Sequence, residues 1–347
     1  MSTAPTAATS GDDRVVTRSA LNTFLAMPAV GAFIGAIVIA ALFFAVAPAF
    51  RNVANIGTIL YVCSTIGIMA IFVALLMIGG EFDLSTGVAV TASGLAAAHT
   101  SWYFGLNVWV GVILALVFSL AVGAFNGWLF NKTGLPSFLV TLGSFFVLQG
   151  VNLAVTRIVT GGVSSNRIND IDGYDSAQAV FASEFNLGPV NIKITVVYWI
   201  LLTALLSFIL LRTRYGNWIL ATGGDAAAAR AVGVPVRATK LALFMGTGFA
   251  AWLVGMHNLF EYNTVQSGQG IGNEFIYIIA AVIGGCLLTG GYGSIVGAAV
   301  GALIYGMTRL GISYAGWDVD WLRTFLGVML IGAVLVNMYV KKRADAR

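Results

Sequence analysis

The chain has 347 residues, of which 59% are hydrophobic and only 9% are charged, with a formal net charge of +4 at pH 7. An ordinary soluble domain carries about 25% charged residues, so this composition excludes a water-soluble fold. Apolar runs of roughly 20 residues are long enough to cross a bilayer as helices. The composition therefore predicts an all-α, polytopic transmembrane helical bundle in a lipid bilayer, with no nucleic-acid partner.

Apolar runs predict about ten membrane spans, which leaves no room for a separate soluble domain. The predicted spans are 27–47, 57–78, 84–99, 108–130, 136–156, 191–212, 238–260, 274–289, 292–313 and 320–340. The third is rich in glycine, so we expect it to be short or broken. Residues 1–20 are polar and are expected to be disordered. Residues 21–340 then form the membrane domain, and 341–347 a tail.

The distribution of Lys and Arg predicts the orientation of the spans. If the N-terminus is cytoplasmic, 12 of the 18 basic residues fall on inner segments. Both termini are therefore predicted to be cytoplasmic. The acidic loop 157–190 then faces outward, and the basic loop 212–240 faces inward.

The inner loop contains a short predicted helix within residues 222–236. Asp225 is a good N-cap, because its carboxylate can accept hydrogen bonds from free amides of the first turn. The alanines that follow favour helix, and Gly233 and Pro235 end it. A soluble partner can bind such a helix. The helix can also be a plain connector between two spans.

The chain carries no recognisable catalytic chemistry. It lacks a Gly-x-x-x-x-Gly-Lys-Ser/Thr phosphate loop and a His-Glu-x-x-His zinc motif. We therefore expect no catalytic residues, no metal ligands and no cofactor, so the chain is not an enzyme. A transporter driven by ATP needs its ATPase on another chain. Proton coupling is poorly supported, because the acidic residues lie at predicted span ends rather than in mid-membrane.

Four segments in order carry a family resemblance. Residues 79–87 read Gly-Gly-Glu-Phe-Asp-Leu-Ser-Thr-Gly, and residues 135–143 read Leu-Pro-Ser-Phe-Leu-Val-Thr-Leu-Gly. The inner loop 221–233 is the third segment. The fourth is Ile-Gly-Gly at 283–285, followed by Gly-Gly-Tyr-Gly-Ser-Ile-Val-Gly at 290–297. Together they resemble the permease subunits of bacterial ATP-binding-cassette importers for monosaccharides, the ribose-type family. The first segment has one more residue between its glycines and its aspartate than the family pattern has.

The resemblance implies a multi-pass permease of the bacterial inner membrane, which imports a monosaccharide or a related polyol. It implies three partners: a second permease copy, a separate ATP-binding subunit on the cytoplasmic side and a soluble substrate-binding protein outside. It also implies that the inner-loop helix is the coupling helix that seats in the ATPase. The residues to which it assigns this role are Asp225, Ala228, Ala229, Arg230, Val232 and Gly233.

Several polar or glycine residues are candidates for lining the pathway. Gly80, Asp83 and Ser85 begin the third span, where the chain forms either a re-entrant break or an ordinary tight turn. In the re-entrant case we expect Asp83 to cap the following helix, assisted by Ser85. In either case we expect Asp83→Ala to weaken the fold or the transport cycle. The candidates from later spans are Asn126, Thr141, Ser144, Gln149 and Asn152. Hydrogen bonding between helices is the alternative role for these residue types.

Glycines at 293, 297 and 301 recur every four residues. Gly293, Gly297 and Gly301 therefore share one face of a predicted helix, where they should mark a close helix–helix contact. The contact lies either within the subunit or between subunits. The repeated Ile-Gly-Gly at 78–80 and 283–285 hints at an internal repeat.

Two other functions remain open on the sequence. One is a secondary transporter or channel that acts without ATP. The other is a permease of the same cassette class for a nucleoside, autoinducer-2 or a branched-chain amino acid, since those permeases are relatives.

Overall fold

The computed structural model describes the backbone of residues 28–345 and the side chains of residues 29–336. The segment 1–20, which was expected to be disordered, lies outside the described residues. The helices are α2 (Pro28–Val46), the 3-10 helix η1 (Pro48–Arg51), α3 (Asn55–Ile78), α4 (Thr86–Phe104), α5 (Val108–Thr133), α6 (Ser137–Thr160), α7 (Tyr174–Phe181), α8 (Ile194–Arg212), α9 (Arg214–Gly224), α10 (Ala226–Ala231), α11 (Val236–Tyr262), α12 (Asn273–Ile283), α13 (Ile295–Tyr314) and α14 (Trp321–Asp345). Two short strands, β1 (Glu184–Leu187) and β2 (Val190–Lys193), complete the described secondary structure.

The chain is an all-α membrane protein. Seven of the described helices are long and apolar enough to cross a bilayer, namely α2, α3, α5, α6, α8, α11 and α13. The shorter apolar helices are α12 and the first part of α14. The count of about ten spans and the positions of the termini stay predictions.

Two predicted spans differ from the structure. The third was expected to be short or broken, but α4 is one continuous helix of 19 residues. Its small residues, including Gly87 and Gly94, let the backbones of neighbouring segments approach it closely. The eighth was predicted over 274–289, but α12 has only 11 residues. A helix of that length is about 16 Å long, roughly half of the hydrocarbon core.

The predicted outer loop 157–190 contains secondary structure. Its first residues belong to α6, and helix α7 and most of an antiparallel hairpin lie within it. The hairpin pairs Glu184 with Lys193 and Leu187 with Val190. Gly188 has φ 63°, a left-handed conformation that suits the tight turn between the strands. Helix α14 continues to Asp345, so it includes most of the predicted tail 341–347.

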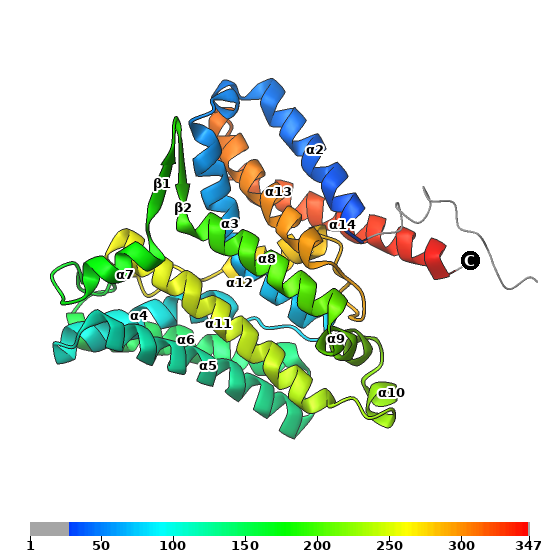
Figure 1. Cartoon of the computed structure of the whole chain (residues 1–347), viewed down its shortest axis with the longest axis horizontal. Coiled ribbons are helices and arrows are strands. Elements are labelled where there is room, and N and C mark those ends of the chain that lie inside the picture. Colours follow the sequence, from blue (N-terminus) through cyan, green and yellow to red (C-terminus); the bar gives the residue numbers. More distant parts are fainter. Residues whose placement is uncertain (1–27, 346–347) are drawn as a thin grey trace, which may run out of the picture.

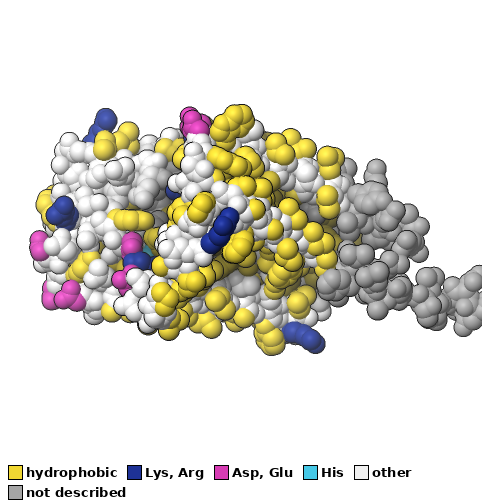
Figure 2. Space-filling model, turned by 90° about the horizontal axis from the view of Figure 1, so that it is seen from above, with side chains coloured by type: hydrophobic (Ala, Val, Ile, Leu, Met, Phe, Trp, Pro, Cys, Tyr) yellow, Lys and Arg dark blue, Asp and Glu magenta, His cyan; other side chains and the backbone are white. Residues whose placement is uncertain are grey.

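The core is formed by α3, α4, α11, α12 and α13. Nearly all of α3 from Ile66 onward is buried, and so are most residues of α4 and α13. Helices α2, α5, α6 and α8 instead expose many large apolar side chains. Figure 2 shows broad apolar areas on one face of the molecule, with few charged side chains among them. This is the surface that a bilayer would cover.

Helix α10 and the β1–β2 hairpin lie far apart in the fold (Figure 1). We call the end that carries α10 the inner end and the end that carries the hairpin the outer end. The names follow the orientation predicted from the basic residues.

Candidate functional site

A buried polar network surrounds the segment between α3 and α4. Asp83 accepts hydrogen bonds from the amide and the hydroxyl of Ser85, at 2.9 and 2.6 Å, and from the hydroxyl of Thr247, at 2.9 Å. Asn126 donates to the Ser85 hydroxyl at 3.0 Å, and Ser144 donates to Asn126 at 2.5 Å. The network joins α4, α5, α6 and α11.

Helix α6 also holds the backbone of this segment. The amide of Phe82 donates to the hydroxyl of Ser137 at 3.1 Å, and the amide of Leu84 donates to the hydroxyl of Thr141 at 3.0 Å. Both hydroxyl residues lie in the first turns of α6, whose first residue follows Pro136. An extended backbone inside the bundle needs such partners, because unpaired polar groups are costly in lipid.

Asp83 does not cap α4 as expected. The N-cap is Ser85, and the Asp83 carboxylate binds the amide and hydroxyl of that residue instead of first-turn amides. Asp83 precedes the N-cap by two residues, so its side chain closes a turn before the helix. The other oxygen of its carboxylate is thereby free to accept from Thr247 on α11.

The structure places the predicted pathway residues in four different settings. Asp83, Ser85, Asn126, Thr141 and Ser144 belong to the network described above, in which they bond to one another or to nearby backbone. Asn152 lies apart and donates to the carbonyl oxygen of Val88 at 3.2 Å, Gln149 is partly exposed, and Gly80 lies at the inner end. These contacts match the alternative role of bonding between helices; lining of the pathway stays a prediction.

A buried ion pair lies beside the network. The ammonium group of Lys240, in the second turn of α11, contacts the carboxylate of Glu81. The two side chains are only 11% and 8% exposed. Lys240 also lies over the ring of Phe130, 4.9 Å from its centroid. Nothing in the sequence pairs residues 159 positions apart, so sequence reasoning missed this contact.

Glycines from three segments meet at the inner end. A side chain at Gly223 on α9 would overlap the carbonyl oxygen of Ile78 and would lie 2.7 Å from the amide nitrogen of Gly291. A side chain at Gly290 would lie 2.7 Å from the Cα atom of Gly80 and from the carbonyl oxygen of Gly223. The amide of Gly291 donates to the Ile78 carbonyl at 2.9 Å. We call Gly80, Gly223, Gly290 and Gly291 the glycine junction.

The helices α3 and α12 end in the same way, each at its Ile-Gly-Gly. Gly79 and Gly284 follow them with φ −71° and −67°, and the next residues, Gly80 and Gly285, have φ 87° and 93°. In each case the amide after the second glycine bonds to the carbonyl five residues back. This left-handed ending reverses the chain direction, so α3 and α12 both lead into buried turns at the inner end.

The packing glycines lie close to α12 and α3. On α13, Gly297 packs on the carbonyl of Gly284 and Gly301 packs on that of Ala280. Gly293 precedes α13, which begins at Ile295, so the expectation that all three share one helix face is wrong. Gly293 instead contacts the side chains of Ile78 and Cys286. These contacts lie within one chain.

The inner segment 222–236 is not a single helix. Thr222 belongs to α9, α10 covers only Ala226–Ala231, and Val236 begins α11. Asp225 separates the two inner helices because its extended backbone ends α9, while its side chain accepts from the amides of Ala227 and Ala228 at 2.8 and 3.0 Å. Gly233, at φ 88°, follows the end of α10.

Helix α10 presents most of its surface to the outside. Of the residues assigned to coupling, Ala229 is buried, whereas the others are exposed: Asp225, Ala228, Arg230, Val232 and Gly233. Val232 is 80% exposed. A largely exposed apolar side chain close to an arginine at the inner end is a surface that a partner protein can cover.

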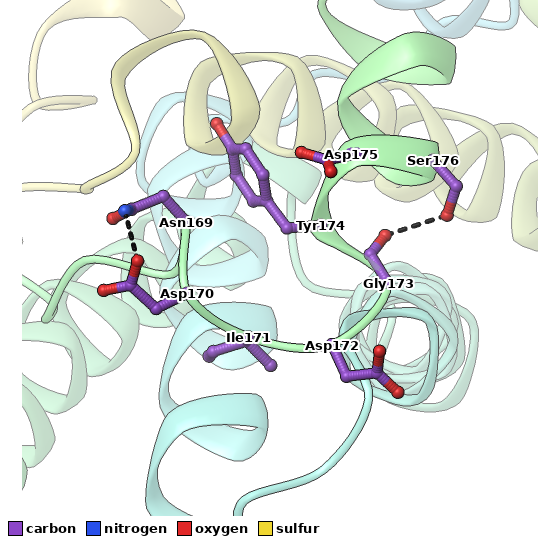
Figure 3. A pocket seen from close by; sticks show the side chains of 8 residues that line it. All are labelled: Asn169, Asp170, Ile171, Asp172, Gly173, Tyr174, Asp175 and Ser176. Atoms are coloured by element: carbon purple, nitrogen blue, oxygen red, sulfur yellow. Dashed lines mark hydrogen bonds between the residues drawn. The ribbon is translucent and has the colours of Figure 1, made fainter.

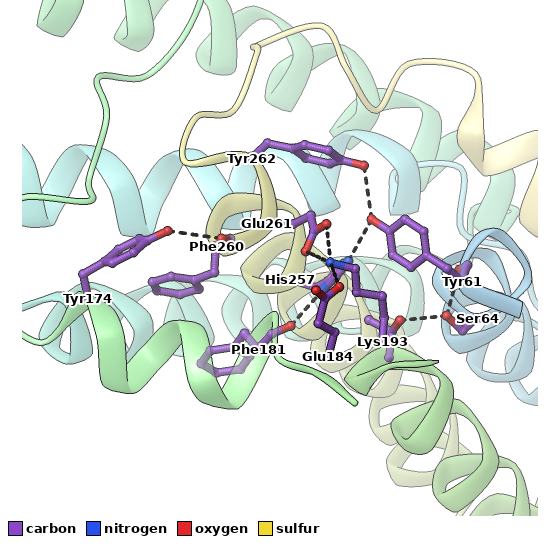
Figure 4. Close-up of polar contacts among 11 residues, drawn as sticks. Tyr61, Ser64, Tyr174, Phe181, Glu184, Lys193, His257, Phe260, Glu261 and Tyr262 are labelled. Atoms are coloured by element: carbon purple, nitrogen blue, oxygen red, sulfur yellow. Dashed lines mark hydrogen bonds and ion pairs between the residues drawn. The ribbon is translucent and has the colours of Figure 1, made fainter. Parts of the chain in front are cut away.

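The outer end carries a second polar cluster (Figure 4). His257 on α11 donates from Nδ1 to the carbonyl of Phe181 at 2.8 Å, and its Nε2 lies 3.1 Å from the hydroxyl of Tyr61. Lys193, at the end of the hairpin, forms ion pairs with Glu184 and Glu261, each at 2.9 Å. Burial alone would lower the pKa of Lys193, but the two carboxylates outweigh it and raise this pKa. These contacts fix the hairpin to α11.

An open pocket lies in the outer loop before α7 (Figure 3). Residues 169–176 line it, including Asp170, Asp172 and Asp175. Asn169 donates to Asp170 at 2.8 Å, and Asn107 donates to Asp172 at 3.3 Å. Among the described residues, no group of three or more His, Cys, Asp or Glu side chains is arranged to hold a metal ion.

Comparison with known proteins gives the family. The family described as "Branched-chain amino acid transport system / permease component" matches residues 55–334. The ribose import permease protein RbsC of Escherichia coli is 31% identical over 88% of this chain and 92% of its own length. The fructose import permease protein FrcC of Rhizobium meliloti is 30% identical over 82% of this chain and 78% of its own. The xylose transport system permease protein XylH of E. coli is 28% identical over 85% and 88%.

No solved structure matches the chain. The family match covers the helices that build the polar network, the glycine junction and α10. On these grounds, the chain belongs to the family of multi-pass inner-membrane permease components of ATP-binding-cassette importers.

Proposed function

We propose that this chain is the membrane subunit of an ATP-driven importer for a monosaccharide. The observation that carries the proposal is the exposed helix α10 at the inner end, capped by Asp225 and connected through α9 to the glycine junction. The relatives named for ribose, fructose and xylose support the sugar class. The chain itself supplies the path, and a separate ATP-binding subunit supplies the energy.

Helix α10 would transmit movement from the ATPase. It is joined to α9 through Asp225 alone, and α9 packs through Gly223 on the last carbonyl of α3 and on Gly291. These contacts are made by backbone atoms without intervening side chains. A displacement of α9 would therefore move the neighbouring segments directly rather than be absorbed by side-chain rearrangement. Movement of α10 would therefore reach the turns after both α3 and α12.

A soluble binding protein would deliver the sugar at the outer end. The loop of residues 169–176 presents three carboxylates there, and the hairpin presents Phe185 and Leu187, which are both exposed. A binding protein with basic residues around its ligand cleft would complement the carboxylates. A second copy of this chain would complete the path, because importers of this class use two membrane subunits.

Co-purification with the ATP-binding subunit tests the coupling role. Ala227 is exposed on α10, so Ala227→Trp should fold but place an indole where the ATPase would seat. We expect this variant to lose the ATPase in detergent, whereas Leu187→Trp on the outer hairpin should retain it. Retention of the ATPase by Ala227→Trp, or sugar transport by the chain without nucleotide, would contradict the proposal.

A further inference from the structure

The segment between α11 and α12, residues 263–272, descends into the bundle from the outer end (Figure 1). Near its start, Val265 contacts Gly94, in the middle of α4. Near its end, Gly270 lies so close to the carbonyl of Gly87 and the hydroxyl of Thr91 that a side chain there would overlap both. The segment therefore runs along α4 from its middle to its first turn.

The level of Gly87 fixes the depth of this segment. The neighbouring Val88 carbonyl accepts a hydrogen bond from Asn152 at 3.2 Å. Asn152 lies closer to the middle of α6 than to either end, and α6 is long enough to cross a bilayer. Gly270 and the start of α12 consequently lie near the middle of the membrane.

Hydrogen bonds hold the segment in an irregular shape. The amide of Ser165 donates to the carbonyl of Val265, and the amide of Ser267 donates to that of Val163, both at 2.9 Å. The Ser165 hydroxyl also accepts from the amide of Val265 at 3.0 Å. These contacts tie the segment to the chain that follows α6, so its conformation is set by the protein on one side.

The other side of the segment is polar and open. Gln266 and Gln269 are exposed, and their side-chain carboxamides make no hydrogen bond to the described part of the chain. Irregular backbone at membrane depth is tolerated only where it is buried in protein or lines water. We infer that residues 263–273 line the aqueous sugar pathway, with Gln266 and Gln269 forming a subsite for a neutral polyhydroxyl solute.

The chemistry of the segment suits such a ligand. Residues 263–273 carry no charged side chain. The next residue, Glu274, is one of the acidic residues expected at span ends, yet it lies at this mid-membrane level. Its carboxylate is buried and accepts from the amide of Gly272 at 3.1 Å, so it is covered by protein. Each carboxamide offers both donors and an acceptor, as a sugar hydroxyl requires. Two exposed amides give contacts that favour passage over tight binding. That the ligand is a sugar rests on the proposed function. That water reaches the segment does not depend on it.

Thiol labelling tests for water around the segment. The native cysteines, Cys63 and Cys286, are buried, so the background should be low. Gln269→Cys in the assembled transporter should react with a membrane-impermeant cationic thiosulfonate added from outside. The matched control is Val147→Cys, because Val147 is 64% exposed near the middle of α6 and would face lipid. We expect labelling of Gln269→Cys at least about tenfold faster, since the reactive thiolate forms in water.

Equal labelling rates for the two variants would overturn the inference, because the segment would then be covered by lipid or by the second copy. This measurement needs neither a sugar nor ATP. A wild-type complex that takes up none of ribose, fructose and xylose would count against the proposed function instead.

Uptake by substituted transporters tests the subsite. Gln269→Met keeps the length of the side chain but removes its hydrogen bonds, and Gln269→Asn keeps the amide. With whichever of ribose, fructose or xylose the wild type transports, Gln269→Met should lower uptake about five- to tenfold, as expected for one lost hydrogen bond. Gln269→Asn should retain more uptake than Gln269→Met. Unchanged uptake by Gln269→Met would overturn the subsite.

Discussion

The hydroxyl of Thr247 on α11 donates a 2.9 Å hydrogen bond to the carboxylate of Asp83, in the turn before α4. The two residues are 164 positions apart in the sequence. The bond ties the helix that follows α10 to the segment that follows α3. The carboxylate of Asp83 also accepts from the amide and the hydroxyl of Ser85, so three groups meet at this side chain.

Replacement of Asp83 tests whether this network supports the fold. Asp83→Ala leaves the amide and hydroxyl of Ser85 without their acceptor, while the Thr247 hydroxyl keeps the carbonyl of Phe244. We therefore expect a loss of about 2–3 kcal/mol in the free energy of unfolding. Asp83→Asn keeps one oxygen for Ser85 and should cost less than about 1.5 kcal/mol. Thermal unfolding of the two variants in detergent measures the difference. If Asp83→Ala and Asp83→Asn both melted at the temperature of the wild type, the carboxylate would not be a structural acceptor.

The glycine junction predicts different results for two adjacent glycines. Gly223→Ala places a methyl group against the Ile78 carbonyl and should destabilise the chain by more than about 2 kcal/mol, because the core is overpacked there. Gly224→Ala meets nothing within 4 Å and should be neutral or slightly stabilising.

ATP-dependent uptake by the two glycine variants measures the same contact in function. Gly223→Ala should lose most transport even where the protein still assembles with its ATPase, and Gly224→Ala should resemble the wild type. If both variants transported equally, the junction would play no part in coupling.

The ion pair of Glu81 and Lys240 predicts a double-mutant rescue. Lys240→Met leaves the Glu81 carboxylate buried without a partner, at a cost of about 3–5 kcal/mol. Replacing both residues by methionine removes both charges and should return the melting temperature close to that of the wild type. A double variant as unstable as the single one would mean that the pair contributes packing that methionine cannot replace.

The ion pairs of Lys193 predict how the stability of the outer hairpin depends on this residue and on pH. Lys193→Gln should destabilise the hairpin by about 1–2 kcal/mol, a value between those of exposed and buried ion pairs. Because the pKa of Lys193 is raised in the folded chain, its contribution is complete below the ordinary pKa of lysine, about 10.4. The contribution is lost as the pH rises through the raised value. Limited proteolysis at Gly188 from pH 8 to 11 should show this loss in the wild type and not in Lys193→Gln.

The sequence predicted the long apolar helices and the short capped helix in the inner loop. Apolar length signals the spans directly, and Asp225 followed by alanines is a local signal that needs no tertiary context. The repeated Ile-Gly-Gly lies at two similar helix ends, at Gly79 and at Gly284, while the internal repeat that it suggested stays a prediction. These features depend on residues close together in the chain.

Contacts between distant segments could not be predicted. No local pattern pairs Glu81 with Lys240 or Asp83 with Thr247. Hydropathy also merged α12 with the turn after it, because Cys286, Leu287 and Leu288 are apolar although they lie outside the helix. The descent of residues 263–272 into the bundle was missed for a different reason. Hydropathy interprets a polar segment between two apolar ones as a surface loop.

Uptake into proteoliposomes tests the central claim most directly. The chain would be reconstituted with its ATP-binding subunit, and the sugar-loaded binding protein added on the outer side. We predict ribose, fructose or xylose uptake that requires ATP and all three components, and that Ala227→Trp abolishes. Uptake by the chain alone at an undiminished rate without nucleotide would contradict the claim that the chain is a path whose energy comes from a separate ATP-binding subunit.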